Sequence, residues 1–365
     1  MAQVNEAATA TTTGTAPPDP PPERIGVPPG RRPLWRGLLL STVVLLVLCA
    51  ASLAVGAKEI PLDQLWHALA HSTGTENDVI VRTLRIPRTL TAVAAGAALG
   101  LAGTLMQSLT RNPLADPGLL GVTAGASAAV VTAIAFLGIG TATGFLWFSL
   151  AGAGVATLLV CALGGIGRVS SVRLALAGTA VNAALIGYVN GVELLHQQAL
   201  DQLRMWSVGS LSGSSGSALL SCLPLLLLGL ALSGAAARPL NALALGEDAA
   251  RAVGVRVGRT RSLGIIAVTL LCGTATALCG PIAFVGLMIP HAVRARTGPD
   301  LRRLLPYALL LAPCLLLAAD IVGRVLTSPS EVPAGVMTAV IGAPVFIALV
   351  RGWGKGRGQG KAVGL

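Results

Sequence analysis

The sequence is short of charged and of aromatic side chains. Of its 365 residues only 11% are charged and 3% are Phe, Trp or Tyr. A soluble globular domain carries about 25% charged residues, so this chain lacks the polar surface that several water-soluble domains would need. Six cysteines are too few for a disulfide-rich secreted scaffold, and 53% hydrophobic residues exclude a disordered chain. The remaining class is a helical protein that crosses a membrane several times.

Long apolar runs recur along the chain, at about the 20 residues that a helix needs to cross a bilayer core. The runs are continuous, whereas the strands of a transmembrane β-barrel would alternate in polarity. The 45 glycines suit helices that approach closely inside lipid. We therefore predict an all-α polytopic membrane protein with ten spans, at residues 37–56, 89–109, 119–139, 145–165, 174–195, 217–237, 262–280, 281–293, 304–322 and 334–350.

Three regions are expected from composition. Residues 1–33 are rich in Ala, Thr and Pro and form a disordered tail, residues 34–351 form one transmembrane domain, and residues 352–365 form a basic, Gly-rich tail. The first 33 residues lack the early apolar stretch of a signal peptide, so we expect the first span to be retained.

The distribution of Lys and Arg predicts the orientation. With both termini cytoplasmic, ten spans place 20 of the 26 Lys and Arg residues on the cytoplasmic side, which is the positive-inside pattern. This bias explains most of the net charge of +11, so no nucleic-acid partner is needed. We expect a multi-pass protein of the cytoplasmic membrane.

A few basic residues lie on the disfavoured side. Arg82, Arg85 and Arg88 recur at every third position just before the second predicted span. They either snorkel to the lipid interface or form a docking surface for an acidic external partner. Arg324, four residues after Asp320, joins this surface or pairs locally.

Two segments of the sequence echo each other. Residues 113–120 (PLADPGLL) and 281–288 (PIAFVGLM) both read P-[LI]-A-x-x-G-L-[LM]. Five predicted spans separate them, so the two copies would lie in opposite orientations. Inverted repeats interrupted by Gly and Pro are typical of transporters whose pathway opens to either side.

Motifs for chemistry are absent. The chain has no P-loop, no H-E-x-x-H and no G-x-S-x-G sequence, so we expect no catalytic residue, metal site or cofactor in it. His67 and His71 are four apart, but two ligands without a third favour an interfacial helix that also carries Trp66. No carboxylate lies near the middle of a predicted span, which argues against an ion-driven carrier.

The longest predicted inner loop, residues 238–261, contains a candidate short helix. Glu247 and Asp248 would begin it and Gly254 would end it. Its narrow Ala face either fits the groove of a partner protein or rests at the membrane interface.

Several motifs in order give the chain a family resemblance. It resembles the FecCD-type permease subunits of bacterial ABC importers for ferric siderophores, haem and cobalamin. The similarity covers about residues 38–351 and rests on LRIPR at 84–88, NPLADPGLLG at 112–121, the loop around 246–254, GPIAFVGLMIPH at 280–291, EVPAG at 331–335 and GAPVF at 342–346.

The resemblance implies ten helices per subunit, two permease subunits as a homodimer or heterodimer, two ATPase subunits that bind ATP and Mg, and an external substrate-binding protein. It also implies roles for single residues: docking of the binding protein by Arg85, Arg88 and Arg324, an inner gate at Asn112, Leu114, Ser170 and Ser171, and coupling to the ATPase through Gly246, Glu247, Asp248, Ala249, Arg251 and Gly254.

The expected function is therefore transport without bond chemistry. Ferric siderophore is the expected cargo because it is the commonest one in the family, with haem or cobalamin as alternatives. An ion-coupled secondary transporter is a further alternative, whereas no catalytic cluster supports a membrane enzyme.

Overall fold

The computed structural model describes residues 34–56, 60–70, 74–165, 171–327 and 330–358, and within them helices joined by turns are the only regular secondary structure. The predicted tail at residues 1–33 lies outside these ranges. The first half contains α1 (Leu34–Ala54), α2 (Leu62–Ala70), α3 (Glu76–Val79), the π-helical turn η1 (Ile80–Arg85), α4 (Ile86–Thr110), the 3₁₀ turn η2 (Pro117–Leu120), α5 (Val122–Leu137), α6 (Ala142–Gly164) and α7 (Ser171–Leu195). The second half contains α8 (Gln197–Ser207), α9 (Gly216–Ala244), α10 (Glu247–Ala252), α11 (Val257–Cys279), α12 (Val285–Thr297), α13 (Leu301–Leu326) and α14 (Ala334–Gly358).

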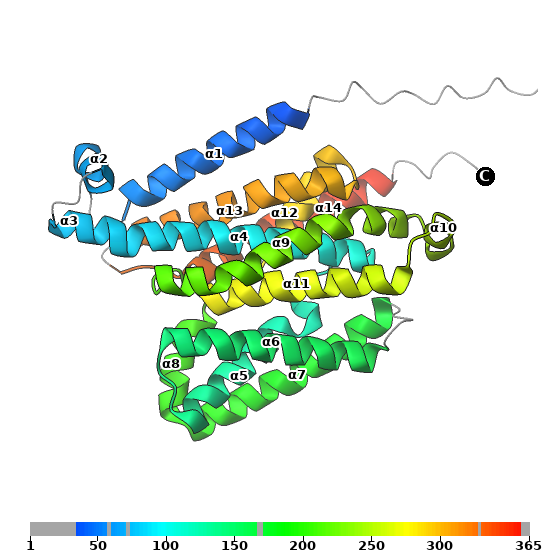
Figure 1. Ribbon diagram of the computed structural model, residues 1–365, viewed down its shortest axis with the longest axis horizontal. Helices are drawn as coiled ribbons and strands as arrows, with labels where there is room; N and C mark the ends of the chain where they lie inside the picture. The colour runs from blue at the N-terminus through cyan, green and yellow to red at the C-terminus, as the bar shows by residue number, and fades with distance from the viewer. Residues whose placement is uncertain (1–33, 57–59, 71–73, 166–170, 328–329, 359–365) are drawn as a thin grey trace, which may run out of the picture.

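The long helices lie side by side, and the short ones mark the two ends of the bundle (Figure 1). Helices α2, α3 and α8 gather at one end, called here the α8 end, and α10 projects from the other, called here the α10 end. Helix α1 begins and α14 finishes at the α10 end, so the first and last described residues of the chain lie on the same side of the bundle.

The predicted spans all fall on helices, and the all-α, multi-span architecture is confirmed. In the part of the chain that the structure describes, seven helices are long and apolar enough to cross a membrane, while α5 and the apolar part of α14 are shorter. The count of ten spans stays a prediction. Helix α14 continues to Gly358, beyond residue 352 where the basic tail was predicted to begin.

Helix α4 is the centre of the bundle. It packs against α9, α11, α12 and α13, and 83% of its apolar window is buried inside the protein. Small residues permit this crowding: a Cβ at Gly103 would collide with the backbone of Gly286 in α12, and one at Gly96 would lie 2.6 Å from the Cα of Pro313 in α13. Glycine is therefore required where these helices cross.

The two echoed segments meet beside α4. Pro117, from the first segment, lies 3.5 Å from the position that a Cβ on Gly286 of the second would occupy. Gln107 of α4 donates a hydrogen bond from Nε2 to the carbonyl of Leu287, at 3.1 Å. The echo thus joins two segments that are 168 positions apart in the chain, and the inverted relation between the two halves stays a prediction.

Helix α1 is the least buried of the long helices. Only 11% of its apolar window is buried, and it packs chiefly along α13 at the edge of the bundle (Figure 1). Its hydrophobic contacts alone are few, so the polar contacts at its C-terminal end carry more weight than they would in a core helix.

Candidate docking, gating and coupling sites

The three arginines before α4 lie on an irregular helical turn. Residues 80–85 form a π-helical turn in which the amide N–H of Ile86 reaches back to the carbonyl of Val81. Pro87 follows and has no N–H to offer the preceding turn. Because the turn is wider than an α-helical one, Arg82, Arg85 and Arg88 point to different neighbours and do not form one stripe.

Two of the predicted docking arginines reach the end of α1. Arg85 donates from Nη1 to the carbonyls of Leu53 and Ala54, at 2.6 and 2.7 Å. Arg324 donates from Nη1 to the carbonyls of Ser52 and Val55, at 3.0 and 2.9 Å. These carbonyls belong to the last turn of α1 and to Val55, the residue that follows it, where no further helical N–H groups are available to them. Both guanidinium cations also interact favourably with the partial negative charge of that helix end.

Arg88 and Arg324 share a buried carboxylate. Asp320 is fully buried, accepts two-pronged hydrogen bonds from Arg88 at 2.7 to 3.2 Å, and pairs with Arg324 at 3.0 Å. The remaining prong of Arg88, Nη1, lies 2.6 Å from Oε2 of Glu331 in the connection between α13 and α14. We call these four residues the arginine–carboxylate network.

The three arginines predicted to dock the binding protein, Arg85, Arg88 and Arg324, differ in how accessible their guanidinium groups are. Arg85 is 6% exposed and Arg324 2% exposed, so their guanidinium groups are occupied inside the protein. The side chain of Arg88 is 12% exposed and reaches the surface beside Glu331. The structure therefore brings all three arginines to the α8 end, and only Arg88 faces outward. Their docking role stays a prediction.

Glu331 was missed as a site residue, although its motif was part of the family resemblance. It lies 243 positions from Arg88 in the chain, and nothing local marks the pair. The partnership of Asp320 with Arg324 is different, because an acidic and a basic residue four apart on one helix face each other. The sequence therefore did contain a signal for the local pairing of Arg324 with Asp320.

The predicted inner gate is only partly described. Arg111 ends α4 in the left-handed conformation, and Asn112 then folds the chain into a tight turn by accepting a hydrogen bond from the amide of Leu114, at 2.9 Å. Leu114 is 48% exposed at the α10 end of α4. Ser170 lies outside the described residues, and Ser171 is the first residue of α7. The gating role of these four residues stays a prediction.

The predicted coupling helix is present as α10. It begins after Gly246 and ends before Gly254, which have φ angles of 122° and 81° that other residues rarely adopt. Ala250 is fully buried, whereas the flanking Leu245 and Val253 are 81% and 70% exposed. The helix is thus anchored on one side and presents apolar side chains at both ends, and its coupling role stays a prediction.

One carboxylate links α10 to a long helix. Glu247 pairs with Arg261 of α11 at 2.6 Å and with Arg251 of α10 itself at 3.1 Å. Arg251 also pairs with Asp248, at 3.1 Å, but its side chain is 59% exposed. Arg261 is only 17% exposed and was not predicted as a site residue. Its ion pair is the stronger mechanical link, because solvent weakens exposed pairs.

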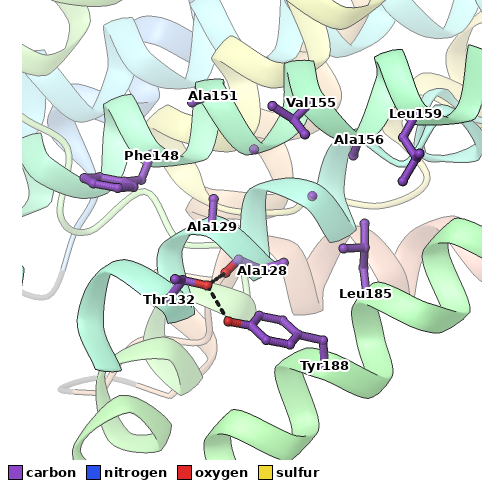
Figure 2. A pocket seen from close by; sticks show the side chains of 12 residues that line it. Ala128, Ala129, Thr132, Phe148, Ala151, Val155, Ala156, Leu159, Leu185 and Tyr188 are labelled. Carbon is purple, nitrogen blue, oxygen red and sulfur yellow. Dashed lines mark hydrogen bonds between the residues drawn. The ribbon is translucent and has the colours of Figure 1, made fainter. Parts of the chain in front are cut away.

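A fourth feature is an apolar cleft of about 510 Å³ between α5, α6 and α7. Figure 2 shows Thr132 of α5 and Tyr188 of α7 pointing toward each other below the α6 residues Val155 and Leu159, with their hydroxyl oxygens 2.8 Å apart. Small and apolar side chains line the rest of it, so the cleft offers no charged group to a polar cargo.

Metal chemistry finds no support among the described residues. They contain no group of three His, Cys, Asp or Glu side chains that could hold a metal ion, and all six cysteines are free. His67 lies on α2 beside Trp66, which is 72% exposed, and His71 is outside the described residues. The placement of Trp66 fits the interfacial helix that the sequence favoured.

Comparisons with known proteins show the family of the chain. The profile of the FecCD transport family matches residues 44–352. The chain is 49% identical over 321 residues to the ferric enterobactin transport system permease protein FepD of Escherichia coli K12, covering 86% of this chain and 94% of FepD. It is 39% identical over 323 residues to the hemin transport system permease protein HmuU of Yersinia pestis, covering 87% and 95%.

A solved structure supports the same assignment at the level of the fold. It is described as an inward-facing conformation of a metal-chelate type ABC transporter, and it matches with a TM-score of 0.78 and 29% identity over 87% of this chain and 99% of that one. The resemblance predicted from the motifs is confirmed. The chain belongs to the FecCD transport family and is a membrane-embedded permease subunit of an ABC transporter, which works with ATPase and substrate-binding components and is not itself an enzyme.

Proposed function

We propose that this chain forms half of the membrane pathway of an ATP-driven importer for a ferric siderophore, delivered by an extracytoplasmic substrate-binding protein. The observation that supports this assignment of the cargo is the 49% identity to FepD over 94% of that permease. Haem is the second candidate, because of the 39% identity to HmuU. Cobalamin remains the third candidate, because of the 36% identity to the cobalamin import system permease protein BtuC of Halobacterium salinarum.

The orientation follows from charge and from the two ends of the bundle. Most Lys and Arg residues belong to the α10 end under the ten-span topology, so this end faces the cytoplasm with both termini. Helix α10 then meets the ATPase, where ATP and Mg bind. The α8 end, with the arginine–carboxylate network, faces the binding protein in the cytoplasmic membrane of a bacterium.

The pathway requires a second permease subunit, as a second copy or a related chain. Helix α7 supports this stoichiometry, because it packs on α5 and α6 along one side and leaves Leu176, Ile186 and Leu194 more than half exposed on the others. We propose that part of this surface contacts the second permease and that the rest contacts lipid.

The mechanism needs no bond chemistry in this chain. A loaded binding protein docks at the α8 end, and nucleotide-driven closure of the ATPases displaces α10. The Gly-packed contacts of α4 with α12 and α13 then let these helices move as units, because backbones in direct contact leave no side chains to repack. The loop at Asn112 and Leu114 narrows the cytoplasmic mouth until the pathway opens.

Complementation tests the cargo. An Escherichia coli K12 strain that lacks FepD receives this chain, and uptake of radiolabelled ferric enterobactin is measured with and without depletion of ATP. We expect ATP-dependent uptake above the empty-vector level. Restored uptake of hemin without uptake of ferric enterobactin would contradict the siderophore assignment and favour the second candidate.

A matched variant tests the driving force. Glu193 is the one carboxylate of α7, lies near the α8 end, and is the residue of that helix that an ion-coupled carrier could use. The Glu193→Gln variant should transport as well as the unaltered chain. Uptake by the purified chain in vesicles without any ATPase would contradict the proposal and favour the secondary transporter.

A further inference from the structure

The arginine–carboxylate network contains a carboxylate that occupies the outward-facing prong of Arg88. Nε and Nη2 of Arg88 are committed to Asp320, which is fully buried. Only Nη1 is directed toward the surface, and it lies 2.6 Å from Oε2 of Glu331, whose side chain is 30% exposed. A protein that docks at the α8 end therefore meets Glu331 before it meets Arg88.

Charge makes this arrangement unfavourable for an acidic partner. Arg88 and Arg324 carry two positive charges, and Asp320 and Glu331 carry two negative ones, so the four groups sum to zero. With Glu331 turned away, the same surface has a net charge of +1 and an unoccupied Nη1 donor. A negatively charged partner would then be attracted, and its carboxylate could accept one charge-assisted hydrogen bond from Nη1 of Arg88.

We propose that Glu331 is a resident carboxylate that holds Nη1 of Arg88 until an acidic side chain of the docked substrate-binding protein replaces it. The proposal rests on the proposed function. It assigns the contact to Arg88 and leaves Arg85 and Arg324 as the groups that hold the end of α1. Glu331 thereby sets the specificity of docking, since only a partner with a carboxylate at this point recovers the hydrogen bond that is lost.

The geometry allows the exchange without unfolding the site. Asp320 keeps its two-pronged contact with Arg88 and its pair with Arg324 when Glu331 leaves, so no buried charge loses its partner. Glu331 is part of the connection between α13 and α14, and the next residue, Val332, is held by a backbone hydrogen bond to Gly323 at 3.0 Å. The side chain can therefore swing away while the backbone stays in place.

The test uses the assembled transporter in lipid nanodiscs and its own loaded binding protein, with association measured by biolayer interferometry over a salt series. Glu331→Gln should tighten binding about three- to fivefold, because a partly exposed ion pair contributes about 1 kcal/mol or less. The association rate should rise and become more sensitive to salt. Asp201→Asn on α8, an exposed carboxylate at the same end, should change neither.

A second background shows whether the effect passes through Arg88. Arg88→Lys keeps a cation beside Asp320 but lacks a separate prong for a second carboxylate, so adding Glu331→Gln to it should produce no gain in affinity. Glu331→Ala should behave like Glu331→Gln, with a melting temperature that confirms folding. If the unaltered transporter binds the loaded protein and Glu331→Gln leaves that affinity unchanged or lowers it, this inference alone is overturned. Failure of the unaltered transporter to bind would overturn the proposed function as well.

Discussion

The clearest energetic prediction concerns Arg324. Replacing it with Met removes the pair with Asp320 at 3.0 Å and three hydrogen bonds to α1, to the carbonyls of Ser52 and Val55 and to the hydroxyl of Ser52. Met fills much of the same volume with apolar atoms. The change therefore tests the charge and the hydrogen bonds with little change in packing.

The magnitude follows from what is left without a partner. Breaking one side of a buried ion pair costs about 3–5 kcal/mol, because the other charge remains buried. Here Asp320 keeps its two-pronged contact with Arg88, which places the cost near the lower end. The carbonyls of Ser52 and Val55 lose their donor. We expect Arg324→Met to destabilise the folded protein by about 3 kcal/mol, chiefly by loosening α1.

The assay combines a global and a local measurement on the purified protein in detergent. Denaturant titration reports the loss of stability, and amide hydrogen exchange of residues 49–56 reports whether the end of α1 opens. Arg204→Met on α8 removes an exposed arginine from the same end and should stay within about 0.5 kcal/mol of the unaltered protein. Equal stability and exchange for the two variants would refute the idea that Arg324 holds α1.

Three further predictions concern the rest of the fold. Glu247→Gln should lower uptake about fivefold while ATP hydrolysis continues. The double variant Glu247→Arg with Arg261→Glu exchanges the two charges and should restore coupling. Loss of both uptake and ATP hydrolysis in the double variant would contradict a link through the Glu247–Arg261 pair. Gly103→Ala should destabilise by about 3 kcal/mol or more in denaturant titration, because the added Cβ meets backbone, whereas Gly154→Ala adds a Cβ in open space and should be neutral. The helix cap Asp300 has a lowered pKa, chiefly because its carboxylate accepts a hydrogen bond from the amide two residues on, so its contribution is complete at neutral pH and is lost as the pH falls below about 4. Asp300→Ala should cost about 1 kcal/mol at neutral pH and less in acid, and a cost that grows on acidification would reverse the sign of this argument.

The helices could be predicted from the sequence because lipid imposes a simple rule. A span must satisfy its own backbone and carry about 20 apolar residues, and each predicted span does fall on a helix. The short helix α10 was also readable, since its acidic start and its closing Gly254 are local signals. The end of α14 was not, because the residues after 350 change composition without breaking the helix.

The partners of the charged residues could not be predicted, for a different physical reason. Arg88 meets Asp320 and Glu331 across 232 and 243 positions, and no local pattern encodes such contacts. The regular spacing of Arg82, Arg85 and Arg88 predicted a common face, but the π-helical turn before α4 turns the side chains apart. Family resemblance grouped Arg85, Arg88 and Arg324, which do lie at one end of the protein, and it could not say which of these three is the most accessible.

The two ends of the protein differ in how firmly they are built, and this difference suits a transport cycle. At the α8 end, the buried Arg85 and Arg324 hold the end of α1, and the buried carboxylate of Asp320 joins Arg324 to Arg88, so a docking partner meets a rigid surface. At the α10 end, a six-residue helix is bounded by Gly246 and Gly254 and is tied to α11 by the Glu247–Arg261 pair. Force applied there reaches α11, and through it the Gly-packed α4, before it reaches the α8 end. We therefore expect weakening of the α10 tie to uncouple nucleotide hydrolysis from transport, and weakening of the α8 network to change docking or stability first.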